Sequence, residues 1–169
     1  YTTDLTQLGR EGRLRENLNF EAETTRLMKM LGKDSGRQPV LLNDDKANQE
    51  TIVEQLALRI SRGNAPSDLL NKKVIKLETA FLFSTANNPA DAMAAVDAVL
   101  RGVIASRGQT IIYIDELSNL IASDEAKADL IKGVASGNLK IVGASGVDAY
   151  RQQIEPRSEI ATLFDGILV

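Results

Sequence analysis

Residues 111–116 read Ile-Ile-Tyr-Ile-Asp-Glu, an apolar run that ends in two adjacent carboxylates. Such a run, rich in β-branched residues and without a polar position, is typical of a strand buried on both faces of a parallel sheet. Four further short apolar runs predict strands of the same kind, at residues 40–42, 74–77, 140–142 and 167–169.

Between these runs, apolar residues recur with the period of a helix. We expect helices over 20–31, over 52–60 and over 90–105, and a fourth that Asp124 caps and that runs toward Val134. Strand and helix therefore alternate along the chain, which predicts an α/β fold with a mainly parallel sheet and helices on both faces. In such folds ligands bind beyond the carboxyl ends of the strands, here at 43–50, 79–89, 115–118 and 144–147.

The composition narrows the function further. The 169 residues fit one globular domain, with 43% hydrophobic and 25% charged residues. The chain has no cysteine and no histidine, which excludes thiolate nucleophiles, histidine bases and the usual zinc sites. A net charge of -3 without a basic run argues against nucleic acid and anionic membranes as partners. No apolar stretch reaches the length of a membrane span and residues 1–14 are polar, so we expect a cytoplasmic protein.

The carboxylates at the end of the first run, Asp115 and Glu116, have the form of a Walker B element. In that element the buried strand fixes an aspartate that holds Mg²⁺, and the glutamate orients the water that attacks a phosphate. The alternative is structural, with Asp115 capping a turn or helix that contains Leu117 and Leu120.

Several co-linear segments resemble the first AAA+ module of Clp-family unfoldases (ClpA, ClpB and ClpC). These segments are Asp4-Leu5-Thr6-Gln7-Leu8-Gly9-Arg10-Glu11-Gly12-Arg13-Leu14, Gln38-Pro39-Val40-Leu41-Leu42, residues 51–60, residues 111–117, Ile141-Val142-Gly143-Ala144-Ser145 and Ala149-Tyr150-Arg151. The resemblance covers nearly the whole chain. It implies the large subdomain of a AAA+ module, with a P-loop-NTPase-like parallel sheet of five strands. We expect residues 1–169 to form that single subdomain, cut from a longer chain and without the small lid subdomain.

The family's phosphate-binding loop has the pattern G-x-x-x-x-G-K-[ST], and this chain departs from it at every motif position. The eight corresponding residues are Asn43, Asp44, Asp45, Lys46, Ala47, Asn48, Gln49 and Glu50. A P-loop needs glycines so that backbone N–H groups converge on the phosphates, a lysine for the β and γ oxygens, and a hydroxyl for Mg²⁺. Here Gln49 takes the lysine position and Glu50 takes the hydroxyl position. The segment reads either as a solvated turn or as a surface that binds a partner.

Other positions that the resemblance marks as functional are also changed. The stretch that corresponds to the adenine-contacting segment reads Asn17-Leu18-Asn19, and the expected arginine pair reads Thr162-Leu163. Arg157 has the wrong offset to replace that pair. Asn88 stands nearest the aromatic residue of the substrate-gripping loop, and the sequence favours a turn that leads into a helix there. Ser145 keeps a hydroxyl at a sensor-like position.

The sequence therefore predicts a degenerate Clp-type AAA+ domain, a pseudo-ATPase that serves as a structural or protein-interaction module. We expect no cofactor, and protein partners such as a Clp-like ring or a second AAA+ module. One alternative is a module that binds or hydrolyses ATP with help from a neighbouring subunit, in which case Asp115 would hold Mg²⁺. Another is an adaptor whose cycle never involves nucleotide.

Overall fold

The computed structural model describes residues 2–32, 37–121 and 123–169. Its centre is a six-stranded sheet in the order β1-β3-β4-β5-β2-β6. Five strands are parallel, and they are β2 (Gln38–Leu42), β3 (Lys73–Leu77), β4 (Thr110–Ile114), β5 (Lys140–Ser145) and β6 (Phe164–Leu168). These confirm the five predicted strands, although β6 begins three residues earlier than expected.

The sixth strand was not predicted. β1 (Thr2–Asp4) pairs antiparallel with β3, with Thr3 opposite Lys76. Its three residues carry no apolar run, so its conformation depends on the neighbouring strand rather than on a local pattern. The sheet is therefore mixed, with β1 at one edge and β6 at the other.

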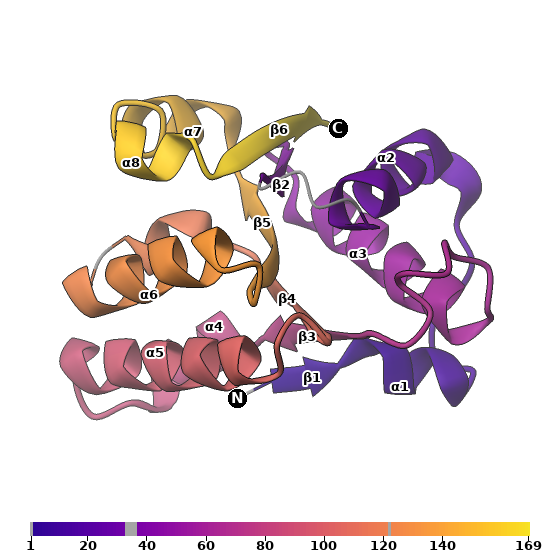
Figure 1. Ribbon diagram of the computed structural model, residues 1–169, viewed down its shortest axis with the longest axis horizontal. Coiled ribbons are helices and arrows are strands. Elements are labelled where there is room, and N and C mark those ends of the chain that lie inside the picture. The colour runs from indigo at the N-terminus through magenta and orange to yellow at the C-terminus, as the bar shows by residue number, and fades with distance from the viewer. Residues whose placement is uncertain (1, 33–36, 122) are drawn as a thin grey trace.

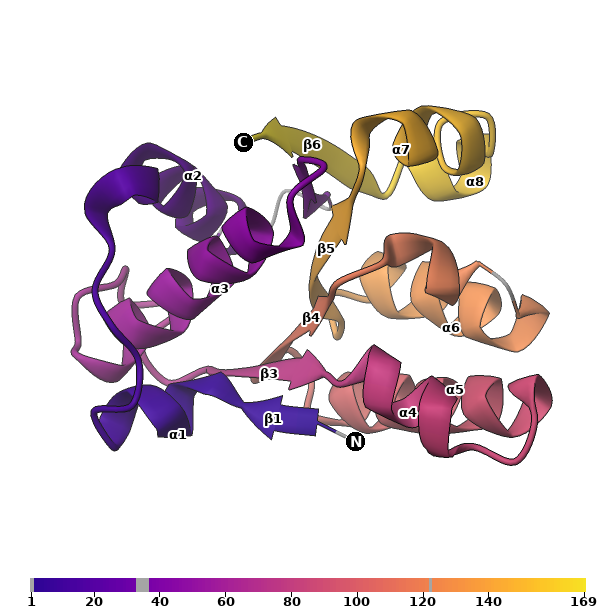
Figure 2. The ribbon, with the colours of Figure 1, turned by 180° about the vertical axis from the view of Figure 1, so that it is seen from behind.

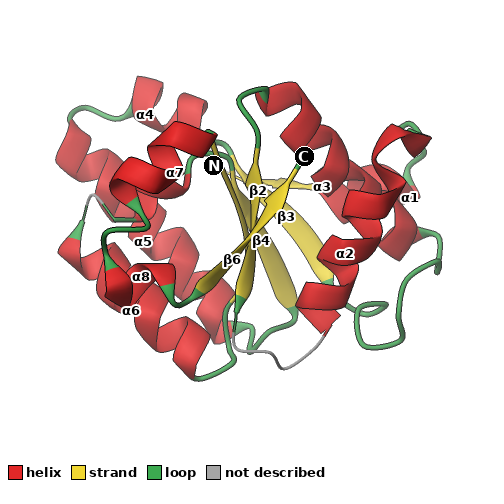
Figure 3. Ribbon diagram, turned by 90° about the horizontal axis from the view of Figure 1, so that it is seen from above, coloured by secondary structure: helices red, strands yellow, loops and turns green. Residues whose placement is uncertain are grey.

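Helices cover both faces of the sheet, as the alternating pattern predicts (Figures 1 and 3). One side carries α1 (Leu5–Arg10), η1 (Leu18–Phe20), α2 (Glu21–Gly32) and α3 (Lys46–Ser61). The other side carries α4 (Thr79–Thr85), α5 (Pro89–Ala105), η2 (Leu117–Leu120), α6 (Asp124–Ala135), α7 (Val147–Gln153) and α8 (Ser158–Ala161). Figure 2 shows the two groups of helices from behind, separated by the strands.

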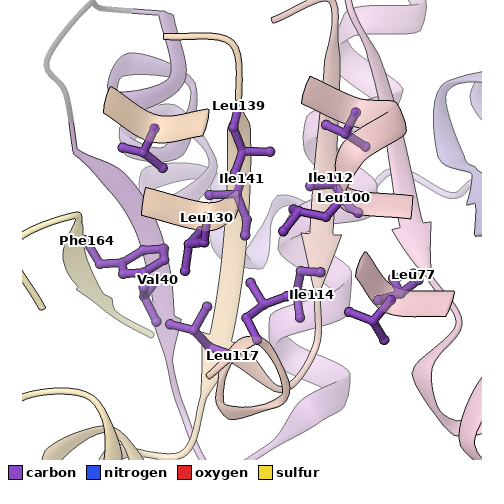
Figure 4. Close-up of a cluster of buried hydrophobic side chains, with 14 of the residues drawn as sticks. Val40, Leu77, Leu100, Ile112, Ile114, Leu117, Leu130, Leu139, Ile141 and Phe164 are labelled. Carbon is purple, nitrogen blue, oxygen red and sulfur yellow. The ribbon is translucent and has the colours of Figure 1, made fainter. Parts of the chain in front are cut away.

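Each face of the sheet has its own hydrophobic core, because successive side chains of a strand point to opposite faces. On β4, Ile112 and Ile114 pack toward α5 and η2, and Figure 4 shows them beside Leu100 and Leu117. Ile111 and Tyr113 of the same strand belong to the opposite core, under α3. All five residues of β4 are buried, which explains why the strand is apolar from Ile111 to Ile114, after the buried Thr110.

Two details of the predicted helices are corrected. α6 is capped by Ser123, whose hydroxyl accepts from the N–H of Ala126, while Asp124 is its first helical residue. α3 begins at Lys46, six residues before the predicted apolar stripe, because Asp45 caps it there. Residues 46–50 are therefore helical, and the turn after β2 is short. None of the described helices is long and apolar enough to cross a membrane.

Candidate functional site

Most of the predicted site residues meet at the carboxyl ends of β2, β4 and β5. They line a hollow of about 340 Å³ whose wall includes Asn43, Asp44, Lys46, Gln49, Asp115, Glu116 and Ser145. Leu117, Ser118, Gly146, Ala149 and Gln153 complete it. These predicted residues therefore lie together, but Asp45, Ala47, Asn48 and Glu50 lie outside this lining.

The turn after β2 is held by hydrogen bonds within the chain. Asn43 donates from its backbone N–H to Ser145 O (3.2 Å) and from its side chain to Val169 O (2.9 Å), and its own Oδ1 accepts from the N–H of Asp45 (2.7 Å). The Asp45 carboxylate accepts from the N–H of Ala47 (2.9 Å). Several backbone donors of this turn thus point at acceptors of the chain itself.

Asp44 links the turn to the helix that follows β5. Its Oδ1 accepts from the N–H of Val147 (3.3 Å), the first residue of α7. The capping position of α7 is Gly146, which has no side chain to cap with. Asp44 therefore supplies a carboxylate to the positive end of α7.

Among the side chains that line the hollow, that of Gln49 makes the most hydrogen bonds. Its side chain is buried, with 1% of the residue exposed. Nε2 lies 3.1 Å from Leu41 O, 2.7 Å from Asn43 O and 3.0 Å from Ser145 O. An amide has two N–H groups, so three acceptors share two donors. Gln49 thereby ties together the end of β2, the turn and the end of β5, and its amide nitrogen is directed at backbone carbonyls.

The acidic pair after β4 is held loosely. Glu116 Oε1 lies 2.6 Å from Lys46 Nζ, with both side chains about half exposed or more. The hydrogen bond to Glu116 raises the pKa of Lys46, and the charges of Glu116 and Asp115 act in the same direction. Asp115 Oδ1 is buried and has no hydrogen-bond partner among the described residues. Glu116 takes the capping position of η2, but its side chain makes no capping hydrogen bond.

Glu50 belongs to a different cluster. Its Oε1 lies 2.6 Å from Lys76 Nζ, on β3, and Glu78 lies 3.9 Å from the same ammonium. The residue at the hydroxyl position of the motif therefore pairs with the chain's own lysine. Burial, together with the charge of Glu50, raises the pKa of Glu54 one turn further along α3. No group of three acidic side chains within the described residues has the arrangement of a metal site.

A second hollow, of about 680 Å³, lies further along α3 and was not predicted. Its lining includes Asn17 and Leu18, from the segment that corresponds to the adenine contact, and Met28, Gln55 and Arg59. Gln55 ties the segment before η1 to α3. Its Oε1 accepts from the N–H of Asn17 (3.0 Å) and its Nε2 donates to Arg15 O (2.8 Å). The available signal in the sequence was a glutamine among the apolar residues of 52–60.

The remaining predicted residues have ordinary structural contacts. Ser145 Oγ donates to Gly146 O (2.9 Å). Arg157 is exposed and donates to Gln153 O (3.1 Å), as expected of a surface residue. Thr162 closes α8 just before β6. Asn88 caps α5 through the N–H of Asp91 (2.9 Å), which agrees with the turn that the sequence favours.

Comparisons with known proteins give consistent matches over the whole chain. It is 32% identical over 175 residues to the chaperone protein ClpB of Rhodopseudomonas palustris and 33% identical over 175 residues to ClpB of Agrobacterium fabrum. It is also 32% identical over 174 residues to the mitochondrial chaperone protein ClpB4 of Arabidopsis thaliana. The chain spans about a fifth of the length of these relatives, at 20%, 20% and 18%. No protein-family model matches it.

Solved structures agree with the sequence matches. The Hsp104–ADP complex of S. cerevisiae superposes with a TM-score of 0.86 at 26% identity, and a closed state of Hsp104 with ATPγS and casein superposes with a TM-score of 0.87 at 26% identity. Each match covers all of this chain and 30% of the Hsp104 chain. With sequence relatives and solved structures matching along its full length, the chain is a AAA+ module of the Clp chaperone family.

Proposed function

We propose that this Clp-family module does not turn over ATP and instead serves the larger protein as a structural or protein-interaction unit. The observation that carries the proposal is the burial and hydrogen bonding of the Gln49 side chain. The residue at the lysine position of the phosphate loop is buried and directs its amide at three carbonyl groups. It offers nothing to a β- or γ-phosphate.

The backbone of the turn supports the same conclusion. Phosphate loops work because glycines allow several N–H groups to converge on the anion. Residues 43–50 contain no glycine, and the N–H groups of Asn43, Asp45 and Ala47 already donate within the chain. A polyphosphate would have to displace these bonds before it could bind.

The charge of the hollow is also unfavourable for a nucleotide. Asp44, Asp115 and Glu116 line it, and Lys46 is the single cationic side chain in the lining. Two like charges about 4 Å apart repel by about 4 kcal/mol at an effective dielectric constant of about 20. Because Lys46 already pairs with Glu116, it compensates little of this repulsion.

A module of this kind can still act by binding other proteins. The chain corresponds to about a fifth of its ClpB relatives, and one Hsp104 structure that it resembles contains casein. We infer that the AAA+ body packs against neighbouring modules or subunits in a ring and leaves turnover to others. Asn88, which caps α5, offers no aromatic surface to grip a substrate chain, so we assign no threading role to this module. We place the protein in the cytoplasm.

The direct test is titration of the purified protein with Mg²⁺-ATP in a calorimeter, together with a phosphate-release assay. We expect no binding up to millimolar ATP and no release above background. A variant that restores the motif, Asn43→Gly with Asn48→Gly, Gln49→Lys and Glu50→Thr, is the matched comparison, and we expect it to bind more tightly than the native chain. Micromolar binding or measurable hydrolysis by the native chain would refute the proposal.

A second function has one specific observation in its favour. Asp115 and Glu116 follow a buried strand as a Walker B element requires, and both line the hollow. If a neighbouring subunit supplied the missing groups, ATP hydrolysis would appear on assembly of the longer protein. It would then be lost in Glu116→Gln, whereas the pseudo-ATPase proposal expects that variant to behave like the native protein.

A further inference from the structure

A buried carboxylate lies far from the strand-end hollow, between α5 and α6. Asp97 on α5 is 3% exposed, and one of its two side-chain oxygens, Oδ1, has no hydrogen-bond donor among the described residues. A carboxylate in this position is costly when it is charged and unpaired. The two helices run side by side in both views of the ribbon (Figures 1 and 2).

The neighbours of Asp97 explain how the structure tolerates it. Arg101, one turn along α5, lies 2.9 Å from Asp97 Oδ2 and 3.2 Å from Asp129 Oδ2 on α6. One guanidinium therefore bridges both carboxylates. Because one guanidinium contacts both carboxyl groups, the two groups lie close together, and a proton on either one relieves the repulsion between them. Arg101 is 63% exposed at its side chain, so it compensates only part of the buried charge.

We propose that Asp97 and Asp129 share one proton and form, with Arg101, a proton-dependent clasp between α5 and α6, which weakens when that proton is lost. The clasp joins two elements that carry the candidate loops. α5 starts directly after the turn at Asn88, and α6 follows the Asp115–Glu116 pair and η2. Release of the proton would thus loosen two loops at once.

The electrostatics of the surrounding groups fix the direction of the effect. Burial, followed by the hydrogen bond and charge of Asp129, raises the pKa of Asp97 to about 6, and Glu125 adds to this while Arg101 opposes it. The hydrogen bond from Asp97 lowers the pKa of Asp129, helped by Arg101 and Lys132.

The stability that Asp97 contributes is present below the usual carboxyl pKa and is lost as the pH rises through about 6. The contribution of Asp129 is present above its usual value and is lost only as the pH falls through its lowered one. Between about pH 4 and pH 6, raising the pH therefore weakens the clasp.

The test compares the melting temperature of the native protein with that of Asp97→Asn at pH 4.5 and at pH 8. Asparagine keeps the shape of Asp97 and can donate to Asp129 at every pH, as protonated Asp97 does. We expect the variant to melt higher than the native protein by on the order of 5 °C at pH 8, and the difference to shrink to about 1 °C at pH 4.5. The proposal is overturned if the difference in melting temperature between the variant and the native protein is the same at both pH values. It is also overturned if the native protein melts at a higher temperature than the variant at pH 8.

Two further measurements guard against a purely structural effect. Asp148→Asn removes an exposed carboxylate on α7, and we expect its effect to be the same at both pH values. A carbon-13 titration of the native protein should place the midpoint of the Asp97 carboxyl near pH 6, and a midpoint below about 4.5 refutes the clasp even if Asp97→Asn does not fold.

Discussion

The turn after β2 and the end of β4 border the same hollow, yet their polar side chains differ in how many hydrogen bonds they make with the rest of the chain. At the end of β2, the side chains of Asn43 and Gln49 form hydrogen bonds with backbone carbonyl and N–H groups of the chain. At β4, Glu116 has one half-exposed ion pair, and Asp115 keeps an unpaired buried oxygen. In the first region the polar side chains make hydrogen bonds that hold the fold together. In the second region the polar side chains make few contacts with the rest of the chain. Substitutions at the two strand ends should therefore have very different costs.

The largest effect is expected at Gln49. Gln49→Ala removes three hydrogen bonds and leaves the buried carbonyl of Leu41 without its side-chain donor, so we expect the free energy of unfolding to fall by about 2–4 kcal/mol. Urea denaturation measures this loss. Gln153→Ala is the matched control, since Gln153 lines the same hollow but is exposed, and it should change stability by less than about 0.5 kcal/mol. Equal losses in the two variants would break the comparison.

Gln55, further along α3, should show an intermediate effect. Gln55→Ala frees the N–H of Asn17 and the carbonyl of Arg15, and we expect a loss of about 1–2 kcal/mol. Amide hydrogen exchange should also speed up at residues 17–19, where the segment is no longer tied to the helix. If exchange there stays unchanged while stability falls, Gln55 acts through packing and does not hold this segment.

The smallest effect is expected at β4. A double-mutant cycle of Lys46→Ala and Glu116→Ala should give a coupling energy of about 0.2–1 kcal/mol, because the ion pair is exposed to solvent. Raising the salt concentration should reduce it further. A coupling above about 2 kcal/mol that resists salt would mean that the β4 end is as firmly built into the fold as the β2 end.

The parts of the fold that local patterns specify were predictable. The apolar run of β4 and the helix after Pro89 are visible in the sequence because burial on two faces and an N-terminal proline leave local signatures. β1 was not predictable, since Thr2–Asp4 becomes a strand only beside β3. Its pairing is a tertiary effect that no window of sequence contains.

The grouping of the strand-end residues was predictable from the sequence, but the hydrogen bonds among them were not. The predicted carboxyl ends of the strands placed Asn43, Gln49, Asp115 and Ser145 at one edge of the sheet, and the structure brings them together. The sequence could say that Gln49 is not a lysine. It could not say that the amide would replace a ligand's contacts with bonds to three carbonyls, because those carbonyls come from Leu41, Asn43 and Ser145.

The two edges of the sheet give the module an uneven risk of aggregation. β1 pairs over three residues at one edge of the described sheet, while β6 presents five residues with an exposed Leu168 at the other, and the longer edge strand is the better template for a new strand. Asp165 is the charged side chain exposed along β6, and charge on an edge strand discourages the pairing of one molecule with another. Neutralising Asp165 would remove that protection, and strand addition should then begin at β6.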